Sequence, residues 1–127
     1  MIRSNRRVLV FSAHAADFCS RSGGAIIRFV DEGCDVKIYD LTYGEKCESP
    51  LLWNENREIT VAEVKEIRRE EIEAAAAVLG APIECLDFDD SPLLVGPERR
   101  AQILEVIRAF QPDVVLCHWI NDYLHPD

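Results

Sequence analysis

The hydrophobic residues of this chain alternate between short, fully apolar runs and longer stretches with helical spacing. The first run, Val8–Phe11, is apolar at every position, as expected for a strand that is buried on both faces. Further strands are predicted at 35–41, 83–88 and 113–119, and the last of these is again almost purely apolar. The pattern therefore predicts four short strands.

Two clear helices are predicted between the first three strands. The segment 18–32 has apolar residues at helical spacing, and Gly33 after it suits the left-handed position that follows a helix end. The second helix begins after Thr60, because TVAE is a capping box in which Glu63 returns a hydrogen bond to the cap residue. Gly80 is predicted to end it.

A third helix is predicted to begin at Pro97, since proline is favoured at the first helical position. The stretch 42–59 has no period and is predicted to be a long loop, which in compact domains is usually functional or mobile. Because strands and helices alternate, we predict a Rossmann-like three-layer α/β fold, a parallel sheet with helices on both faces. Residues 1–127 form a single predicted domain, and we expect it to be the first part of a larger one, incomplete at its C-terminus.

The composition restricts the partners and the compartment. The 14 Lys and Arg residues against 23 Asp and Glu give a formal net charge of −9, which argues against nucleic acids and anionic membranes as partners. No apolar stretch approaches the roughly 20 residues that cross a bilayer. Five scattered cysteines without a CxxC pair are typical of reduced thiols. We therefore expect a cytoplasmic protein. A homo-oligomer is one of the assemblies that the sequence allows.

The residues with the most chemistry follow the predicted strands. Ligands of open α/β sheets bind beyond the carboxyl ends of the strands. His14 follows the first strand, His118 follows the fourth, and His125 lies just beyond, so we expect these side chains at one edge. Each residue also has a structural interpretation: a lone histidine more often packs than binds a ligand, and Asp17 suits the N-cap of a helix that begins at Phe18.

Four stretches narrow these alternatives by their order and spacing: VLVFSAHAADF, LTYGE, RREEIEAAAAVLG and PDVVLCHWINDYLHPD. Together they resemble the LmbE/PIG-L family of zinc-dependent enzymes over nearly the whole chain. Most members of this family remove an acetyl group from an N-acetylated sugar and carry the motifs AHPDDE and, later, HPDH. The resemblance implies an LmbE-like domain with Zn²⁺ as its cofactor.

The resemblance also implies roles for individual residues. His14 and Asp17 match zinc ligands, and His125 matches a catalytic histidine that stabilises developing charge or moves a proton near the substrate. Glu45 and Arg68 match positions near the substrate pocket. These five residues make up the implied site, together with an open zinc position for water or substrate.

The third zinc ligand of the family is the final histidine of HPDH, and this chain ends at Asp127, one residue before it. His118 is the alternative ligand that the chain offers. Because two ligands rarely hold a catalytic metal, we expect weak or absent zinc binding by residues 1–127 alone.

Three residues depart from the deacetylase motif. Ala15 and Ala16 replace its proline and the aspartate that serves as general base, and Phe18 replaces its glutamate. An alanine cannot accept a proton, and a positioned base contributes about 10²–10⁴-fold to a rate. The sequence AH-x-ADF resembles instead the branch of 4-oxalomesaconate hydratases in aromatic-acid catabolism, which add water to an unsaturated oxo-tricarboxylate. Zinc suits that reaction, because it polarises carbonyl groups and activates water.

The leading prediction is therefore a zinc-dependent hydratase, a lyase acting on a small anionic oxo-acid such as 4-oxalomesaconate. Arg21 and Arg68 are the candidate cations for its carboxylates. The second hypothesis is a zinc-dependent N-deacetylase in which Asp89, Asp90 or Asp122 replaces the missing base. The third is a metal-free relic of the fold that serves as a binding or dimerisation module.

Overall fold

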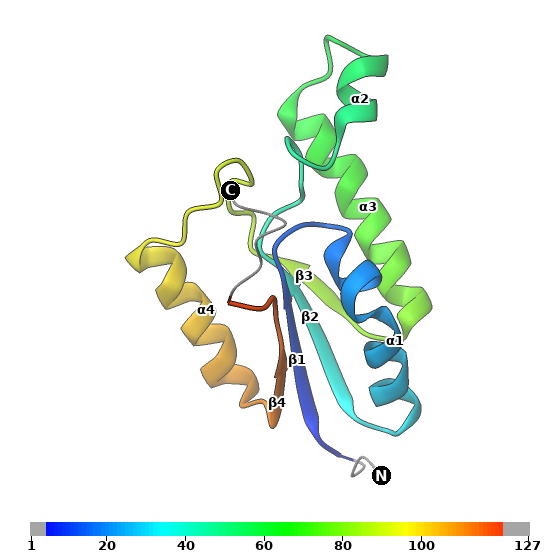
Figure 1. Ribbon diagram of the computed structural model, residues 1–127, viewed down its shortest axis with the longest axis vertical. Helices are drawn as coiled ribbons and strands as arrows, with labels where there is room; N and C mark the ends of the chain where they lie inside the picture. Colours follow the sequence, from blue (N-terminus) through cyan, green and yellow to red (C-terminus); the bar gives the residue numbers. More distant parts are fainter. Residues whose placement is uncertain (1–4, 121–127) are drawn as a thin grey trace.

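The computed structural model describes residues 5–120 and contains eight elements in that range (Figure 1). The strands are β1 (Arg7–Ser12), β2 (Asp35–Asp40), β3 (Ile83–Cys85) and β4 (Val114–Leu116). The helices are α1 (Asp17–Asp31), α2 (Pro50–Glu55), α3 (Val61–Leu79) and α4 (Pro97–Phe110). The predicted alternation of strands and helices is confirmed.

The four strands form one parallel sheet in the order β3-β2-β1-β4. All of β1 pairs with β2, from Arg7 opposite Asp35 to Ser12 opposite Asp40. The chain winds outward from β1 to β3 and then returns across the sheet to β4, so the direction of winding reverses between β1 and β4. Open α/β sheets bind their ligands at such a switch point, beyond the carboxyl ends of the strands.

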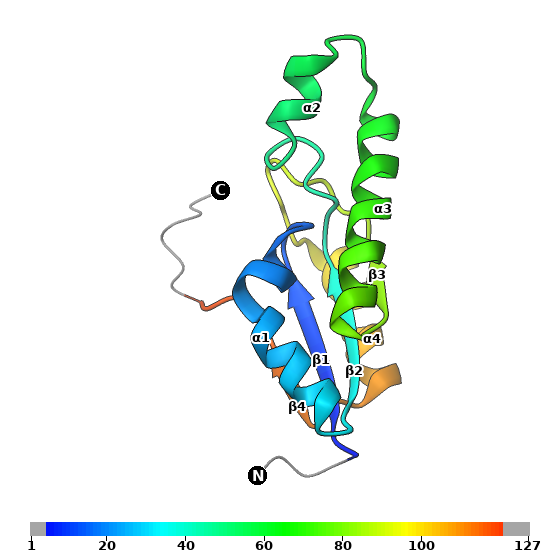
Figure 2. The ribbon, with the colours of Figure 1, turned by 90° about the vertical axis from the view of Figure 1, so that its right-hand side faces the viewer.

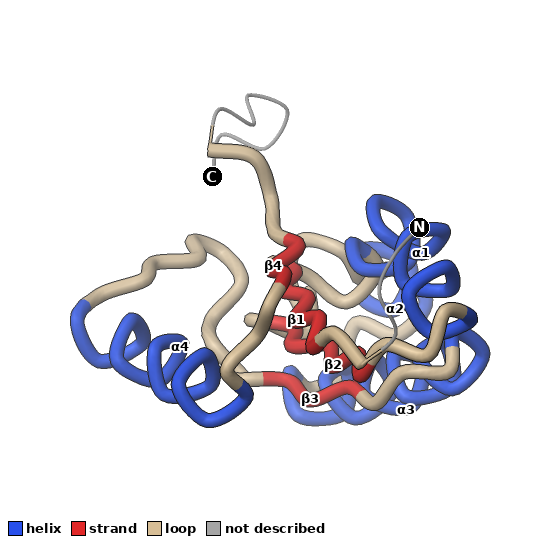
Figure 3. Tube along the Cα trace, turned by 90° about the horizontal axis from the view of Figure 1, so that it is seen from below, coloured by secondary structure: helices blue, strands red, loops and turns tan. Residues whose placement is uncertain are grey.

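The sheet is covered on both faces, which confirms the predicted three layers. Helices α1 and α3 lie side by side on one face, and α4 lies on the other (Figures 1, 2 and 3). The core fills the space between β1, β2 and the inner sides of α1 and α3. Its buried apolar residues include Val8, Val10, Phe18, Ile26, Ile38, Ile72 and Ala76. Each large side chain among them contributes about 1.5–3 kcal/mol by leaving water.

The helix ends follow their sequence signals. The Thr60 hydroxyl accepts the Glu63 N–H at 3.2 Å, and the Glu63 carboxylate accepts the Thr60 N–H at 2.8 Å, so the capping box is confirmed. Gly80 ends α3 in the left-handed conformation, and Pro97 is the first residue of α4. No helix within residues 5–120 has the length and apolar character that a membrane span needs.

The loop 42–59 and the last two strands differ most from the prediction. The stretch 42–59 is not all loop, because it contains α2, which the Trp53 indole fixes by donating to the Glu45 carbonyl oxygen at 2.7 Å. Figure 2 shows α2 beyond the carboxyl ends of the strands. The third strand is shorter than 83–88, since Asp87 has a φ of 56° and interrupts the extended backbone. The fourth strand likewise ends at Leu116.

Candidate active site

The loop after β1 brings His14 and Asp17 together at the switch point. The prediction that Asp17 caps a helix starting at Phe18 is wrong, because α1 begins at Asp17 itself and Ala16 is its N-cap, without a side-chain cap. The Asp17 carboxylate instead accepts the backbone N–H of His14 at 3.1 Å and lies 3.5 Å from the His14 Nδ1 atom. Phe18 is fully buried and anchors this end of the helix in the core.

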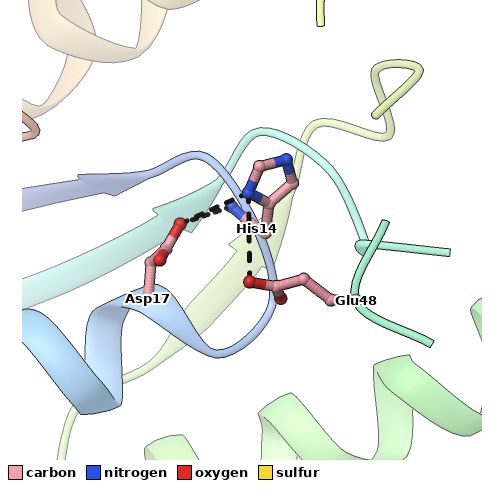
Figure 4. Close-up of side chains that lie close together, drawn as sticks. All are labelled: His14, Asp17 and Glu48. Carbon is pink, nitrogen blue, oxygen red and sulfur yellow. Dashed lines mark hydrogen bonds and ion pairs between the residues drawn. The ribbon is translucent and has the colours of Figure 1, made fainter. Parts of the chain in front are cut away.

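Glu48 is the third member of the cluster and comes from the turn after β2. Its Oε1 atom lies 4.0 Å from His14 Nδ1, and its Oε2 atom accepts the Ala16 N–H at 3.3 Å. One ligand atom from each of His14, Asp17 and Glu48 lies within 4.8 Å of the other two. Figure 4 shows the three side chains converging from the loop after β1, the start of α1 and the turn after β2.

This donor set fits a zinc ion. Imidazole nitrogen and carboxylate oxygen are ordinary zinc ligands at about 2.0–2.2 Å, and donors on a tetrahedron of that size lie about 3.3–3.6 Å apart. The separations of 3.5 Å and 4.0 Å are close to those values, so small side-chain movements bring the donors onto one ion. A metal site at this position is therefore chemically reasonable.

Asp17 is the electrostatic centre of the cluster. Burial alone would raise the pKa of Asp17, but hydrogen bonds with His118 and His14 outweigh it and hold this pKa well below its usual range. The His118 Nε2 atom lies 3.4 Å from Asp17 Oδ2 and 3.1 Å from the Ala13 backbone nitrogen. Arg21 donates to the other carboxylate oxygen at 3.1 Å.

The contact between Asp17 and His14 affects both groups. The hydrogen bond with Asp17 raises the pKa of His14. Asp17 is thus kept ionised, as a metal ligand must be.

A further carboxyl group lies behind the ligands, at the end of β2. Asp40 is fully buried; the Ser12 hydroxyl donates to one of its oxygens, and the other has no hydrogen-bond partner among the described residues. Burial raises the pKa of Asp40 to about 7, and the negative charges of Asp17 and Glu48 add to this effect. The strand end therefore carries a group that titrates near neutral pH.

The residues predicted to bind substrate lie at different places around the cluster. Arg21 contacts Asp17, as described above, and Arg68 on α3 lies 3.7 Å from the Glu48 carboxylate. Glu45 is only 1% exposed and forms an ion pair with Lys65 at 3.7 Å, outside the cluster of ligand atoms. Their contacts with a substrate stay predictions.

The remaining predicted residues divide into two groups. His125 and Asp122 lie outside the described residues. Asp89 and Asp90 are described, but neither belongs to the ligand cluster. Asp89 forms an ion pair with Arg99 at 2.7 Å, and Asp90 accepts two backbone N–H groups of the turn after β2. Through these contacts, both carboxylates stabilise loops.

Sequence reasoning missed Glu48. No local spacing connects it with His14, and its position in the loop after the second strand was the available signal. The structure shows that Gly44 matters for the placement of Glu48, because Gly44 has a φ of 66°. A Cβ atom at Gly44 would lie 3.0 Å from both Cβ and Oε2 of Glu48, so the turn needs glycine to admit this side chain.

Comparisons with known proteins place the chain in a family. The PIG-L family model, described as GlcNAc-PI de-N-acetylase, matches residues 9–127. The chain belongs to the LmbE/PIG-L family. It is 41% identical over 124 residues to 4-oxalmesaconate hydratase of Pseudomonas putida, which covers 95% of this chain and 48% of that protein. It is 33% identical over 125 residues to a diacetylchitobiose deacetylase of Thermococcus kodakarensis, which covers 96% and 45%.

Solved structures give the same result. The 4-carboxy-2-hydroxymuconate hydratase of Pseudomonas putida matches with a TM-score of 0.86 at 40% identity, over 95% of this chain and 51% of that one. The N,N'-diacetylchitobiose deacetylase of Pyrococcus horikoshii matches with a TM-score of 0.82 at 28% identity, over 95% and 44%. These likenesses confirm the predicted fold and family. The chain spans about half the length of these relatives.

Proposed function

We propose that this chain is part of a zinc-dependent hydratase, which adds water to the carbon–carbon double bond of a small unsaturated oxo-acid such as 4-oxalomesaconate. The observation that supports the proposal most is that a carboxylate from another part of the chain, Glu48, lies beside Ala16. This position lacks the aspartate base of the deacetylases, and the Glu48 carboxylate lies on its backbone N–H instead. The identity of 41% to a hydratase, against 33% to a deacetylase, supports the same choice.

Of the three donors in the cluster, His14 and Asp17 are the residues that would hold the zinc ion, and Glu48 stays free for proton transfer. When bound, zinc supplies Lewis acidity towards a substrate carbonyl or carboxylate and lowers the pKa of water. Arg21 contacts Oδ1 of the Asp17 carboxylate, and His118 contacts Oδ2, the oxygen that also faces His14. Groups that orient a metal ligand in this way are worth about 10–100-fold in metal affinity or activity.

Glu48 is the residue that we assign to proton transfer. Its Oε1 atom faces the ligand cluster, while its Oε2 atom is held by the Ala16 N–H. From this position Glu48 takes a proton from water as the water oxygen bonds to one alkene carbon, and a proton is delivered to the neighbouring carbon. The sum is the addition of H and OH without oxidation or reduction. His125 and another group near the substrate are the two alternatives for the donor of the second proton.

An anionic substrate needs positive potential at the site, since the chain as a whole carries a formal charge of −9. Arg21 is the proposed cation that contacts the substrate, and Arg68, 3.7 Å from the Glu48 carboxylate, adds positive potential without contacting the substrate. The start of α1 adds to them, because its N-cap residue Ala16 provides no side-chain cap and a helix N-terminus favours negative charge.

The experiment is a pair of assays on the zinc-loaded protein. We expect loss of the conjugated absorbance of 4-oxalomesaconate and no acetate release from an N-acetylated sugar. Glu48→Gln should lower hydration by about 10²–10⁴-fold and keep the metal content, because it removes the base and leaves the proposed ligands. His14→Ala should lose both activity and zinc, and Glu55→Gln, an exposed site on α2, is the control.

Three outcomes would contradict this proposal. Acetate release without hydration would favour the N-deacetylase hypothesis. Neither activity in a zinc-loaded protein would favour a binding module. Loss of zinc from Glu48→Gln would make Glu48 a ligand rather than the proton-transfer group. The same metal analysis on residues 1–127 tests the prediction that this stretch alone binds zinc weakly.

A further inference from the structure

We propose that Arg68 is a positioning residue, which holds the Glu48 carboxylate in its working orientation. The inference rests on the proposed function, because it assigns to Arg68 a task in the same reaction. The family resemblance predicts only that Arg68 lies near the substrate. The geometry around one oxygen atom, Glu48 Oε2, points to the additional task.

The two oxygens of Glu48 have different surroundings. Oε2 accepts the Ala16 N–H at 3.3 Å and lies 3.7 Å from the Arg68 Nη2 atom. Oε1 lies on the side of the ligand cluster, 4.0 Å from His14 Nδ1 (Figure 4). The Ala16 N–H and the Arg68 guanidinium therefore hold Oε2, and this leaves Oε1 pointing towards His14.

Arg68 is itself anchored on its far side. Its Nη1 atom donates to Glu71 Oε2 at 2.5 Å, three residues further along α3. The Arg68 side chain is 16% exposed, and its Nε atom is buried without a hydrogen-bond partner among the described residues. An ion pair that is partly shielded from water and fixed at one end is stronger than a pair on an open surface. Arg68 can therefore restrain Glu48.

The turn after β2 supplies the complementary restraint. A methyl group at Gly44 would lie 3.0 Å from the Cβ and Oε2 atoms of Glu48, so the side chain runs close against its own turn. The turn is closed by the Ser49 hydroxyl, which donates to the Gly44 carbonyl oxygen at 2.9 Å. Gly44 thus fixes the path of the side chain, and Arg68 fixes the rotation of the carboxylate at its end.

The test compares Arg68→Gln and Arg68→Lys with Arg69→Gln. Arg69 is the matched control, because it lies on the same helix, is 38% exposed and pairs with Glu66 and Glu73 away from the cluster. Arg68→Gln should lower kcat by about 10²-fold with KM within about twofold, as expected when a catalytic group is misplaced. Arg68→Lys should recover about tenfold of that loss, since it keeps the charge without the planar fork. Arg69→Gln should match the wild type.

Two kinetic outcomes would overturn the proposal. A rise in KM at unchanged kcat would make Arg68 a substrate contact, and equal effects of Arg68→Gln and Arg69→Gln would make it a general surface charge. If Arg68→Gln fails to fold by thermal unfolding, Glu71→Gln gives the same readout, because it releases the far end of Arg68. A smaller loss of kcat at constant KM is then expected, and an unchanged kcat overturns the proposal.

A structural readout keeps this inference separate from the proposed function. If the wild type lacks hydratase activity, the proposed function fails, but the position of Glu48 can still be measured. In crystals of Arg68→Gln, the contact between Glu48 Oε2 and the Ala16 N–H should be lost, and in Arg69→Gln it should be kept. Retention of this contact in Arg68→Gln overturns the positioning role.

Discussion

Helices α1 and α3 begin in different ways: the polar groups at the start of α3 stabilise the helix, and those at the start of α1 form the candidate site. α3 begins with a complete capping box, in which the Thr60 side chain accepts a helix N–H. α1 begins after Ala16 with no side-chain cap, and Asp17 in its first turn is directed to His14 and His118. An N-cap side chain stabilises a helix by about 1 kcal/mol. The start of α1 lacks this contribution, and its polar groups build the site instead.

The charges of the two regions show the same contrast. On α3, Arg69 pairs with glutamates at the surface, where water screens the attraction and an ion pair contributes little. At the carboxyl edge of the sheet, Asp17 is 6% exposed and Asp40 is fully buried. Burying a carboxylate is unfavourable unless it is paired and hydrogen-bonded. Perturbed carboxyl groups of this kind are enriched at functional sites.

The largest expected effect comes from placing a carboxylate at the start of α1. Ala16→Asp restores the residue type that the family's deacetylases use as general base. We expect acetate release from an N-acetylated sugar to rise by about 10²-fold, the lower end of what a positioned base contributes. Hydration should fall, because the new charge lies beside Glu48 Oε2 and repels it.

Ser20→Asp is the control for this change, since it adds the same charge at an exposed position one turn along α1. Acetate release that stays at the wild-type level in Ala16→Asp would show that the missing base does not separate the two activities. The same rise in Ser20→Asp would show an effect of charge alone.

The sequence predicts the fold well because its signals are local. Apolar runs, the TVAE capping box and the residues Gly80 and Pro97 act on their immediate neighbours, and each is confirmed. Within the site, the His14–Asp17 contact is also local and was predictable. Glu48 was not, because it joins the cluster only through the pairing of β1 with β2 and the conformation of the turn at Gly44. The length of β3 depends in the same way on backbone geometry at Asp87, which spacing does not reveal.

The next effect is a pH dependence of stability that arises from Asp40. Its pKa is raised to about 7 by burial, so the folded state binds a proton between about pH 4 and 7 that the unfolded state has lost. Stability contributed by this group is therefore present at low pH and falls as pH rises through that window, by about 1.4 kcal/mol per pH unit. Asp40→Asn removes the titration, so the wild type should lose stability relative to this variant from pH 5 to pH 7.

Urea unfolding at pH 5, 6, 7 and 8 measures this difference, because titrating groups that do not interact with Asp40 contribute equally to both proteins and cancel. Asp35→Asn is the control, since Asp35 is exposed at the other end of the same strand. A difference between wild type and Asp40→Asn that is constant over this range would contradict the raised pKa.

The smallest effect is expected at the capping box, and it tests the other half of the comparison. Thr60→Ala removes the hydroxyl that accepts the Glu63 N–H, and should lower the free energy of unfolding by about 1 kcal/mol. Thr60→Ser keeps this acceptor and should stay within a few tenths of a kcal/mol of the wild type. Hydration should be unchanged in both, because Thr60 lies outside the ligand cluster and caps only α3. A loss of activity in Thr60→Ala at a temperature where the protein is fully folded would mean that the start of α3 also shapes the site, and the contrast with α1 would no longer hold.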